Sequence, residues 1–369
     1  VGTWAHAVLE HLAFEDAPAV SADLLAAWRH KDPQARLAAA NQVPYFRRNH
    51  SASQPRQTAF ALATELGERH GHRRDPDRDL LVLALPHILH APLSVPGLGR
   101  GDDGQRYALK PGFCLAHLKD RDRIDELAFD MSMSGGETWR PQADGTPGER
   151  LNPDKLLEVF ALRTAGGAAA SAPDDEGLPR AWDGAPWLDG LLQRVADSRA
   201  ALQDWQNTPT QDRADKPPKL ASVLPKIAGM LTGLIDLTFR AECADGQTRY
   251  FIADYKTNKI SGDGVRTTFA ANYRREGLAE AMAHSHYHLQ ALIYTLALHR
   301  FLRERIAHYD YDTHVGGHLY LYLRGMAGPY VSNDPERVHG VYADRWPKAV
   351  IEAFDTALDP QLPTRREAA

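Results

Sequence analysis

Apolar residues recur with helical spacing in several stretches of the chain, which predicts amphipathic helices. Near the start, Trp4, Val8 and Leu12 are four residues apart and would form one buried stripe of a helix over residues 2–14. Comparable patterns predict further helices over 57–70, 79–92, 152–163, 278–306 (one long helix or two shorter ones) and 346–357.

Other stretches are rich in β-branched and aromatic residues and are bounded by turn residues, which predicts strands over 123–133, 231–242, 248–257 and 315–323. Because predicted helices separate several of these strands, the pattern indicates an α/β core. The stretch 164–186, rich in Ala, Gly, Pro and Asp, is predicted to be a surface loop, and 206–219 is a second polar stretch.

Length and cysteine content narrow the class of protein. The 369 residues suffice for one large domain or two modest ones, and no apolar run is long enough to cross a bilayer. Cys114 and Cys243 are far apart in the sequence and have no ligand-like spacing, so neither zinc nor a disulfide framework is supported. A reducing cytoplasm is therefore expected. The chain begins at Val1 and enters a helical pattern almost at once, so it is expected to be a piece of a longer polypeptide.

The net charge of −5 is not that of a protein that binds DNA by bulk charge. Any nucleic acid would have to be held by local basic clusters or delivered by a partner, and the isolated chain is expected to bind DNA weakly. Such clusters are more often solvated faces than binding sites. The candidates are Arg47-Arg48, Arg274-Arg275 and Arg300/Arg303/Arg305.

The most informative feature is a predicted hairpin whose two strands carry Asp236 and Asp254. A two-residue loop would pair position 236 with 255, and the two carboxylates would then face opposite ways. A three-residue loop, Ala244-Asp245-Gly246, would pair 236 with 254, and a glycine at the last loop position suits the left-handed conformation that such loops need. In this register the two carboxylates are opposite neighbours, with Cβ atoms about 5 Å apart.

Two carboxylates at that separation repel each other unless positive charge lies between them. A divalent cation satisfies this requirement, and oxygen ligands suit magnesium or manganese. Lys256 lies on the same strand face as Asp254, and its ammonium would stabilise developing charge or orient a water. This combination serves the hydrolysis of phosphodiester bonds.

Two other interpretations of these residues stay open. An Asp-x-Lys pair on a strand is usually a surface ion pair of little energetic value, although an acid inside the apolar GLIDLTF stretch is costly to bury without a partner. A pair of carboxylates would also suit a glycosidase, which needs no metal. That alternative leaves Lys256 without a task.

Several motifs resemble the RecB-type nuclease family, the nuclease domain found in exodeoxyribonuclease V. They are GLIDL at 233–237, DYK at 254–256 and Q-x-x-x-Y from Gln290 to Tyr294. The segment 287–326 is also similar to that family, the opening GTWAHAVLE resembles its segment with a metal-binding histidine, and Glu126 to Phe129 resembles its glutamate motif. The similarity is strong over 1–14 and 229–326 and weak over 15–120 and 134–228.

The resemblance implies the restriction-endonuclease-like PD-(D/E)XK fold, with a mixed central sheet flanked by helices and with helical and loop insertions. It implies one nuclease domain over 1–369. Within it, the parts would be the histidine-bearing helix at 1–14, a variable region with the Glu126 strand at 15–228, the catalytic core at 229–358 and a tail at 359–369.

The resemblance also implies a role for each matching residue. His6, Asp236, Asp254 and the Tyr255 carbonyl would ligate Mg²⁺, with Mn²⁺ as the alternative ion, and Lys256 would be the catalytic lysine. Glu126 would assist at the edge of the site. Gln290 and Tyr294 lie one helical turn apart and would brace the substrate or the catalytic strand.

Each of these assignments has a simpler structural alternative. His6 would otherwise be a half-buried histidine of an amphipathic helix, Glu126 an acid at a strand edge, and Tyr294 part of the core. Gln290 is harder to explain as core, because a buried amide needs hydrogen-bond partners. A group of histidines at 284, 286 and 288 suggests metal, but it lies outside the motifs and is interpreted as a solvated helix face.

The implied activity is a magnesium-dependent exo- or endodeoxyribonuclease inside a bacterial helicase–nuclease that repairs double-strand breaks and degrades linear DNA. The substrate would be single strands from unwound duplex. The partners would be RecC-like and RecD-like subunits and a helicase part of the same polypeptide, because this chain has no G-x-x-x-x-G-K-[ST] motif. The alternative is an inactive module of the same fold that binds DNA or a partner.

Overall fold

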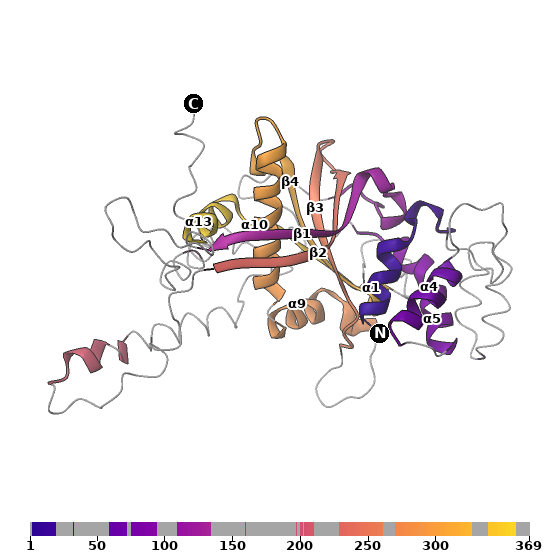
Figure 1. The fold of residues 1–369 in the computed structure, drawn as a ribbon, viewed down its shortest axis with the longest axis horizontal. Helices are drawn as coiled ribbons and strands as arrows, with labels where there is room; N and C mark the ends of the chain where they lie inside the picture. The colour runs from indigo at the N-terminus through magenta and orange to yellow at the C-terminus, as the bar shows by residue number, and fades with distance from the viewer. Residues whose placement is uncertain are drawn as a thin grey trace. The chain divides into compact units, whose positions relative to one another are not determined.

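A computed structural model describes residues 2–19, 32, 59–71, 75–93, 109–133, 159, 197, 200–201, 203–209, 229–260, 270–285, 287–326 and 339–358 (Figure 1). These residues fall into two compact units, which are described separately. The first comprises residues 1–127, 234–282 and 305–345, and the second comprises 128–233, 283–304 and 346–369. Two strands, β1 and β2, have residues in both units.

The described strands form one mixed sheet in the order β1-β2-β3-β4-β5. Strand β3 pairs with β2 in antiparallel and with β4 in parallel orientation, and β5 is antiparallel to β4. The bounds are β1 (Arg123–Met133), β2 (Gly229–Glu242), β3 (Thr248–Lys256), β4 (Val315–Tyr322) and β5 (Val341–Asp344). The predicted α/β class is confirmed, and the four predicted strands are present. The short strand β5 was not predicted.

The hairpin of β2 and β3 has the three-residue loop that the sequence favoured. The backbone N–H of Cys243 donates to the carbonyl of Gln247 at 2.8 Å, and that of Gly246 donates back to Cys243 at 2.9 Å. Gly246 has a φ of 81°, the left-handed conformation that glycine adopts without strain. The paired positions run from Leu237 opposite Ala253 to Glu242 opposite Thr248, so the next pair in this register is 236 with 254.

The interior of the sheet fixes this register. Phe239 and Phe251 are cross-strand partners whose rings stack with centroids 5.3 Å apart. The ring of Phe251 also covers Gly316 on β4, where an added Cβ would lie only 2.1 Å from the ring. All eight residues of β4 are buried. Strand β3, which carries Asp254 and Lys256, is therefore held between two well-packed neighbours.

Helices at the start of the chain pack together within the first unit. The predicted helices at 2–14, 57–70 and 79–92 are present as α1 (Gly2–His11), α4 (Ala59–Arg69) and α5 (Asp75–Leu89) (Figure 1). Trp4, Val8 and Leu12 are all buried, as their spacing predicted. The indole N–H of Trp4 donates to the Ala63 carbonyl at 3.0 Å, which ties α1 to α4.

The predicted helical stretch 278–306 consists of two helices, α9 (Arg275–His284) and α10 (Tyr287–Arg305), and the last predicted helix is α13 (Lys348–Leu358). The shorter helical segments are η1 (Phe14–Asp16), η3 (Leu115–His117), η4 (Asp120–Asp122), η5 (Ala270–Tyr273), α11 (Tyr311–His314) and α12 (Leu323–Met326). No described helix is long and apolar enough to cross a membrane.

Two interpretations of charged or polar groups on α10 were wrong. Arg300 and Arg303 are not a free solvated face, because Asp355 of α13 accepts from both, at 2.6 Å and 2.8 Å. His288 is buried, with 1% of its surface exposed, because it lies on the side of α10 that packs inward. His284 is exposed as expected. Residues 47–48, 164–186, 286 and 359–369 lie outside the described part of the chain, as does nearly all of 152–163.

Candidate active site

Asp236 and Asp254 meet at the end of the hairpin opposite to its turn. One carboxylate oxygen of Asp236, Oδ2, accepts the backbone N–H of Tyr255 at 2.8 Å. The acid of β2 therefore reaches across to the backbone of β3 immediately after Asp254. This contact confirms that the two acidic side chains are neighbours, as the three-residue loop predicted, and not on opposite faces of the sheet.

His6 reaches the same acids from α1. Its Nδ1 lies 3.3 Å from Oδ2 of Asp236, and its ring contacts the ring of Tyr255 edge-on with centroids 5.8 Å apart. Helix α1 can approach β3 this closely because residue 2 is glycine. A Cβ there would lie only 2.9 Å from Oγ1 of Thr257.

Lys256 forms an ion pair with Asp254 inside the site. Its Nζ lies 2.5 Å from Oδ1 of Asp254, and the two side chains are 11% and 5% exposed. The Lys256 ammonium is thus a charged donor beside this buried carboxylate oxygen. The same ammonium lies 5.2 Å from the ring centroid of Tyr320, the residue of β4 that pairs with Asp254.

Burial and neighbouring charges have opposing effects on the pKa of two groups of the site, Asp254 and His6. Burial raises the pKa of Asp254 to about 6, even though the charge of Lys256 acts to lower it, and the charge of Asp236 raises it further. For His6, burial lowers the pKa, but the hydrogen bond and charge of Asp236 and the charge of Asp254 outweigh it and raise the pKa overall. The site is thus short of positive charge around its carboxylates.

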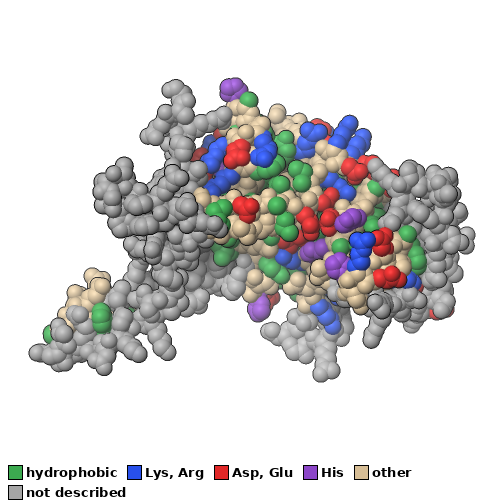
Figure 2. Space-filling view, in the orientation of Figure 1, with side chains coloured by type: hydrophobic (Ala, Val, Ile, Leu, Met, Phe, Trp, Pro, Cys, Tyr) green, Lys and Arg blue, Asp and Glu red, His purple; other side chains and the backbone are tan. Residues whose placement is uncertain are grey.

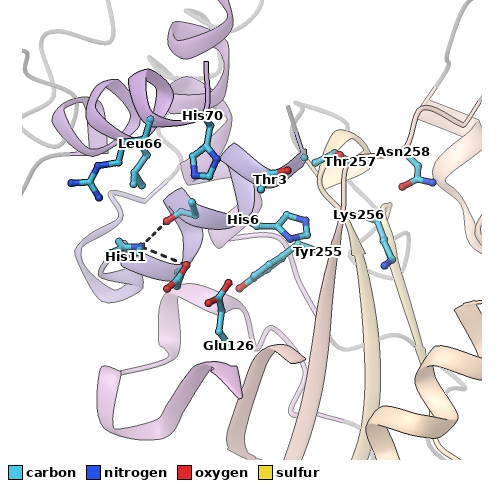
Figure 3. Close-up of a pocket in the computed structure, with 14 residues that line it drawn as sticks. Thr3, His6, His11, Leu66, His70, Glu126, Tyr255, Lys256, Thr257 and Asn258 are labelled. Carbon is cyan, nitrogen blue, oxygen red and sulfur yellow. Dashed lines mark hydrogen bonds and ion pairs between the residues drawn. The ribbon is translucent and has the colours of Figure 1, made fainter. Parts of the chain in front are cut away.

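Glu126 of β1 has an unusual backbone. Its φ is 49°, in the left-handed region that a residue with a Cβ rarely adopts and that costs on the order of 1 kcal/mol or more. Its exposed side chain lines a cavity together with His6, Tyr255 and Lys256 (Figure 3). The residue that was expected at the edge of the site therefore lies there, in a conformation that local packing alone does not favour.

The cavity has a volume of about 520 Å³ and extends from the candidate site to helices α1 and α4. Sequence reasoning missed several residues of its wall. Leu66, His70 and His11 are labelled in Figure 3, and Arg69 and Glu10 also line the cavity. No local motif marks them, because their place depends on how α1 packs on α4. Over these two helices, basic, acidic and histidine side chains are interspersed (Figure 2).

Gln290 and Tyr294 belong to the second unit and are described there. The side-chain amide of Gln290 donates to the hydroxyl of Tyr294 at 3.0 Å, as expected for residues one turn apart. The ring of Tyr294 contacts Phe129 edge-on at 5.8 Å. Tyr294 is half-buried rather than plain core. The structure brings His6, Glu126, Asp236, Asp254, Tyr255 and Lys256 together. The roles of these six residues, and those of Gln290 and Tyr294, stay predictions.

The donors of the site suit a hard divalent cation. Two carboxylates and a backbone carbonyl are the oxygen ligands that magnesium or manganese prefers in proteins, and the His6 imidazole adds a nitrogen donor of a kind more typical of transition metals. Among the described residues, no three His, Cys, Asp or Glu side chains are already arranged as a coordination shell. Lys256 is paired with Asp254, and the Tyr255 amide with Asp236, so a metal would have to compete with these two donors.

Comparison with known proteins identifies the relatives of this chain. It matches no model of a known protein family. It is 42% identical over 265 residues to the RecBCD enzyme subunit RecB of Mycolicibacterium smegmatis, which covers 69% of this chain. By sequence, this chain is a relative of RecB. The RecB subunits of Mycobacterium tuberculosis (35% over 245 residues, 66% of this chain) and Escherichia coli (41% over 130 residues, 35% of this chain) also match.

The match concerns only part of each RecB subunit. This chain covers 19% of the M. smegmatis protein, 17% of the M. tuberculosis protein and 10% of the E. coli protein. The chain thus spans about a fifth or less of the length of these RecB relatives. The similarity that the motifs indicated is confirmed, while the activity and partners of a whole RecB subunit do not transfer to the chain automatically.

Proposed function

We propose that this chain is a divalent-metal-dependent nuclease that hydrolyses DNA phosphodiester bonds, with the PD-(D/E)XK fold. The observation that carries the proposal is the convergence of His6, Asp236 and Asp254 beside Lys256. The mixed sheet and the acid-bearing hairpin are what such a fold requires. The surface-ion-pair interpretation of Asp254 and Lys256 does not account for them, because both side chains are largely buried.

His6, Asp236, Asp254 and the Tyr255 carbonyl would hold the cation, with magnesium as the expected ion and manganese as a substitute. When bound, it supplies Lewis-acid polarisation of the phosphoryl oxygen and lowers the pKa of a water. The Lys256 ammonium stabilises the negative charge that develops on the phosphate during attack. Glu126, at the mouth of the cavity, orients the substrate or a water.

A DNA strand is the substrate that suits the adjoining cavity. The space of about 520 Å³ lies within the size range of small-ligand pockets, large enough for a nucleotide. Its walls carry His70 and Arg69 as groups that can meet a phosphate, although Arg69 is already paired with Glu65. The net charge of −5 disfavours tight autonomous binding of DNA. A strand delivered by a motor fits this charge better than a strand captured from solution.

The similarity to RecBCD enzyme subunit RecB supports a further proposal, that this activity belongs to a RecBCD-type enzyme acting in DNA repair and recombination. The partners would be RecC-like and RecD-like subunits, and a helicase part of the same polypeptide would feed the site with single strands. Gln290 and Tyr294 would brace the substrate or the catalytic strand. The expected location is the bacterial cytoplasm.

The direct test is incubation of a labelled single-stranded oligonucleotide with the protein and magnesium. We expect cleavage by the wild type, none in EDTA, and none by Asp254→Ala or Asp236→Ala. Glu352→Gln, which removes an exposed acid on α13, should cleave like the wild type. Absence of cleavage by the wild type, or equal cleavage by Asp254→Ala, would leave an inactive binding module as the better description.

A further inference from the structure

Arg324 of α12 is hydrogen-bonded to the residue that follows β3, the strand that carries Asp254 and Lys256. Its Nε donates to the backbone carbonyl of Thr257 at 2.8 Å, while the side chain as a whole is exposed. Thr257 directly follows Lys256, and both residues line the cavity. The guanidinium is therefore held one residue beyond the lysine that would act on the phosphate.

The remaining nitrogens of this guanidinium are uncommitted within the described part of the chain. Nε makes the contact with Thr257, and no described acidic side chain pairs with Arg324. Other arginines of the first unit are matched by carboxylates. Arg123 has Asp125, Arg249 has Asp245, and Arg345 has Asp312.

The backbone on both sides of this contact is packed tightly. Gly325 has no room for a side chain, since a Cβ there would lie 2.6 Å from Tyr273. Tyr273 in turn donates its hydroxyl proton to the Asn258 carbonyl at 3.0 Å and accepts from the N–H of Ile260 at 3.3 Å. One tyrosine thus fixes both the α12 backbone and the segment after β3, which holds Arg324 and Thr257 in register.

We propose that Arg324 binds a backbone phosphate of the substrate strand, next to the phosphate that is cleaved; this rests on the proposed nuclease function. A guanidinium whose Nε is fixed presents its two terminal nitrogens as a preorganised fork, the geometry that matches phosphate oxygens. The site needs such a group. Asp236, Asp254 and Glu126 repel a polyanion, and Lys256 is already paired.

Substitutions at this position can separate the structural contact from the charge. In Arg324→Gln, the amide nitrogen stands where Nε was and can still donate to Thr257, but the charge and the terminal donors are lost. Arg324→Met removes both, and Arg324→Lys keeps a charge without the fork. Arg121→Gln is the matched control, since it removes the same charge from a side chain that is 74% exposed.

Binding and cleavage are then measured separately. Affinity for a fluorescent single-stranded oligonucleotide is measured in EDTA over a range of salt, and kcat and KM are measured with magnesium. We expect Arg324→Gln and Arg324→Met to weaken binding and to raise KM about tenfold, because each loses one charge-assisted contact with the phosphate. The slope of log affinity against log salt should flatten by about 0.7. Arg324→Lys should keep much of the wild-type affinity. The kcat and the melting temperature of Arg324→Gln should equal those of the wild type.

Three results would overturn the inference. The first is that Arg324→Gln binds DNA like the wild type while Arg324→Met binds it weakly. In that case the arginine would act only through its hydrogen bond to Thr257. Another is an unchanged salt slope in both variants. The third is an equal loss in Arg121→Gln, which would indicate only general charge. These results are distinct from failure of the nuclease proposal, in which the wild type itself does not cleave.

Discussion

Asp254→Asn should stabilise the fold in the absence of metal while it abolishes metal binding. The wild-type carboxyl is 3% exposed, and burial raises its pKa from 3.8 to about 6 despite the neighbouring Lys256. Each pKa unit corresponds to about 1.4 kcal/mol, so keeping this acid ionised costs the folded state roughly 3 kcal/mol at pH 7. Asparagine has the same shape and no charge to desolvate.

The raised pKa of Asp254 also determines how folding stability changes with pH. Between pH 3.8 and about 6 the folded protein keeps a proton on Asp254 that the unfolded chain releases, so stability from this group falls as the pH rises. The folded state bears the full free-energy cost of the ionised Asp254 above about pH 6, and none of it below 3.8, the pKa of the group in the unfolded chain. The advantage of Asp254→Asn should therefore be largest near pH 7 and should vanish toward pH 4.

Thermal unfolding in EDTA, repeated with saturating magnesium, measures both halves of the prediction. In EDTA at pH 7 the variant should melt several degrees above the wild type. Magnesium at about 100 times its Kd should then stabilise the wild type by about 2.7 kcal/mol and leave the variant unchanged. A variant that melts at or below the wild type in EDTA, or that gains as much from magnesium, would refute the reasoning. Glu352→Gln serves as the control at an exposed acid.

Four further outcomes are expected. Lys256→Gln should lower single-turnover cleavage by about 10²–10³ and keep the magnesium-induced rise in melting temperature; loss of that rise would contradict the assigned role. Tyr320→Leu should lower kcat about tenfold at constant KM, and Tyr320→Phe should restore it, because the ring lies 5.2 Å from the Lys256 ammonium. Gly246→Ala should cost about 1 kcal/mol in urea unfolding, because φ is 81°. Burial lowers the pKa of His299 to about 4, so the contribution of this group to stability should fall by roughly 3 kcal/mol from pH 6.5 to 4, and the difference in unfolding free energy between the wild type and His299→Leu, followed over pH, should show that fall.

The hairpin was predictable from the sequence because its determinants are local. A glycine at the last position of a three-residue loop decides the register, and the register then decides that Asp236 lies beside Asp254. Strand β5, by contrast, has only four residues, and its pairing with β4 comes from a partner that is close in space. Its pattern was too short to distinguish from a loop.

The rest of the site depends on contacts between segments that are far apart in the chain. The position of Arg69 and His70 follows from the packing of α4 on α1. In this packing the indole N–H of Trp4 donates a hydrogen bond to the carbonyl of Ala63, which is 59 residues away in the sequence. Nothing in the α4 sequence indicates that its last turn borders a cavity. The contact between Arg324 and Thr257 likewise joins residues 67 positions apart. Local periodicity predicts elements well and their mutual contacts poorly.

The candidate site combines unfavourable groups with well-packed neighbours. Asp254 is desolvated beside a second acid, and Glu126 has a left-handed backbone. Nearby, the stacked rings of Phe239 and Phe251 hold the two acid-bearing strands in one register. Strain of this kind persists only where the surrounding structure over-determines it, and it is found preferentially at functional sites. A cation bound by the carboxylates would offset the burial of the Asp254 charge and its repulsion by Asp236, the two unfavourable effects that Asp254→Asn removes.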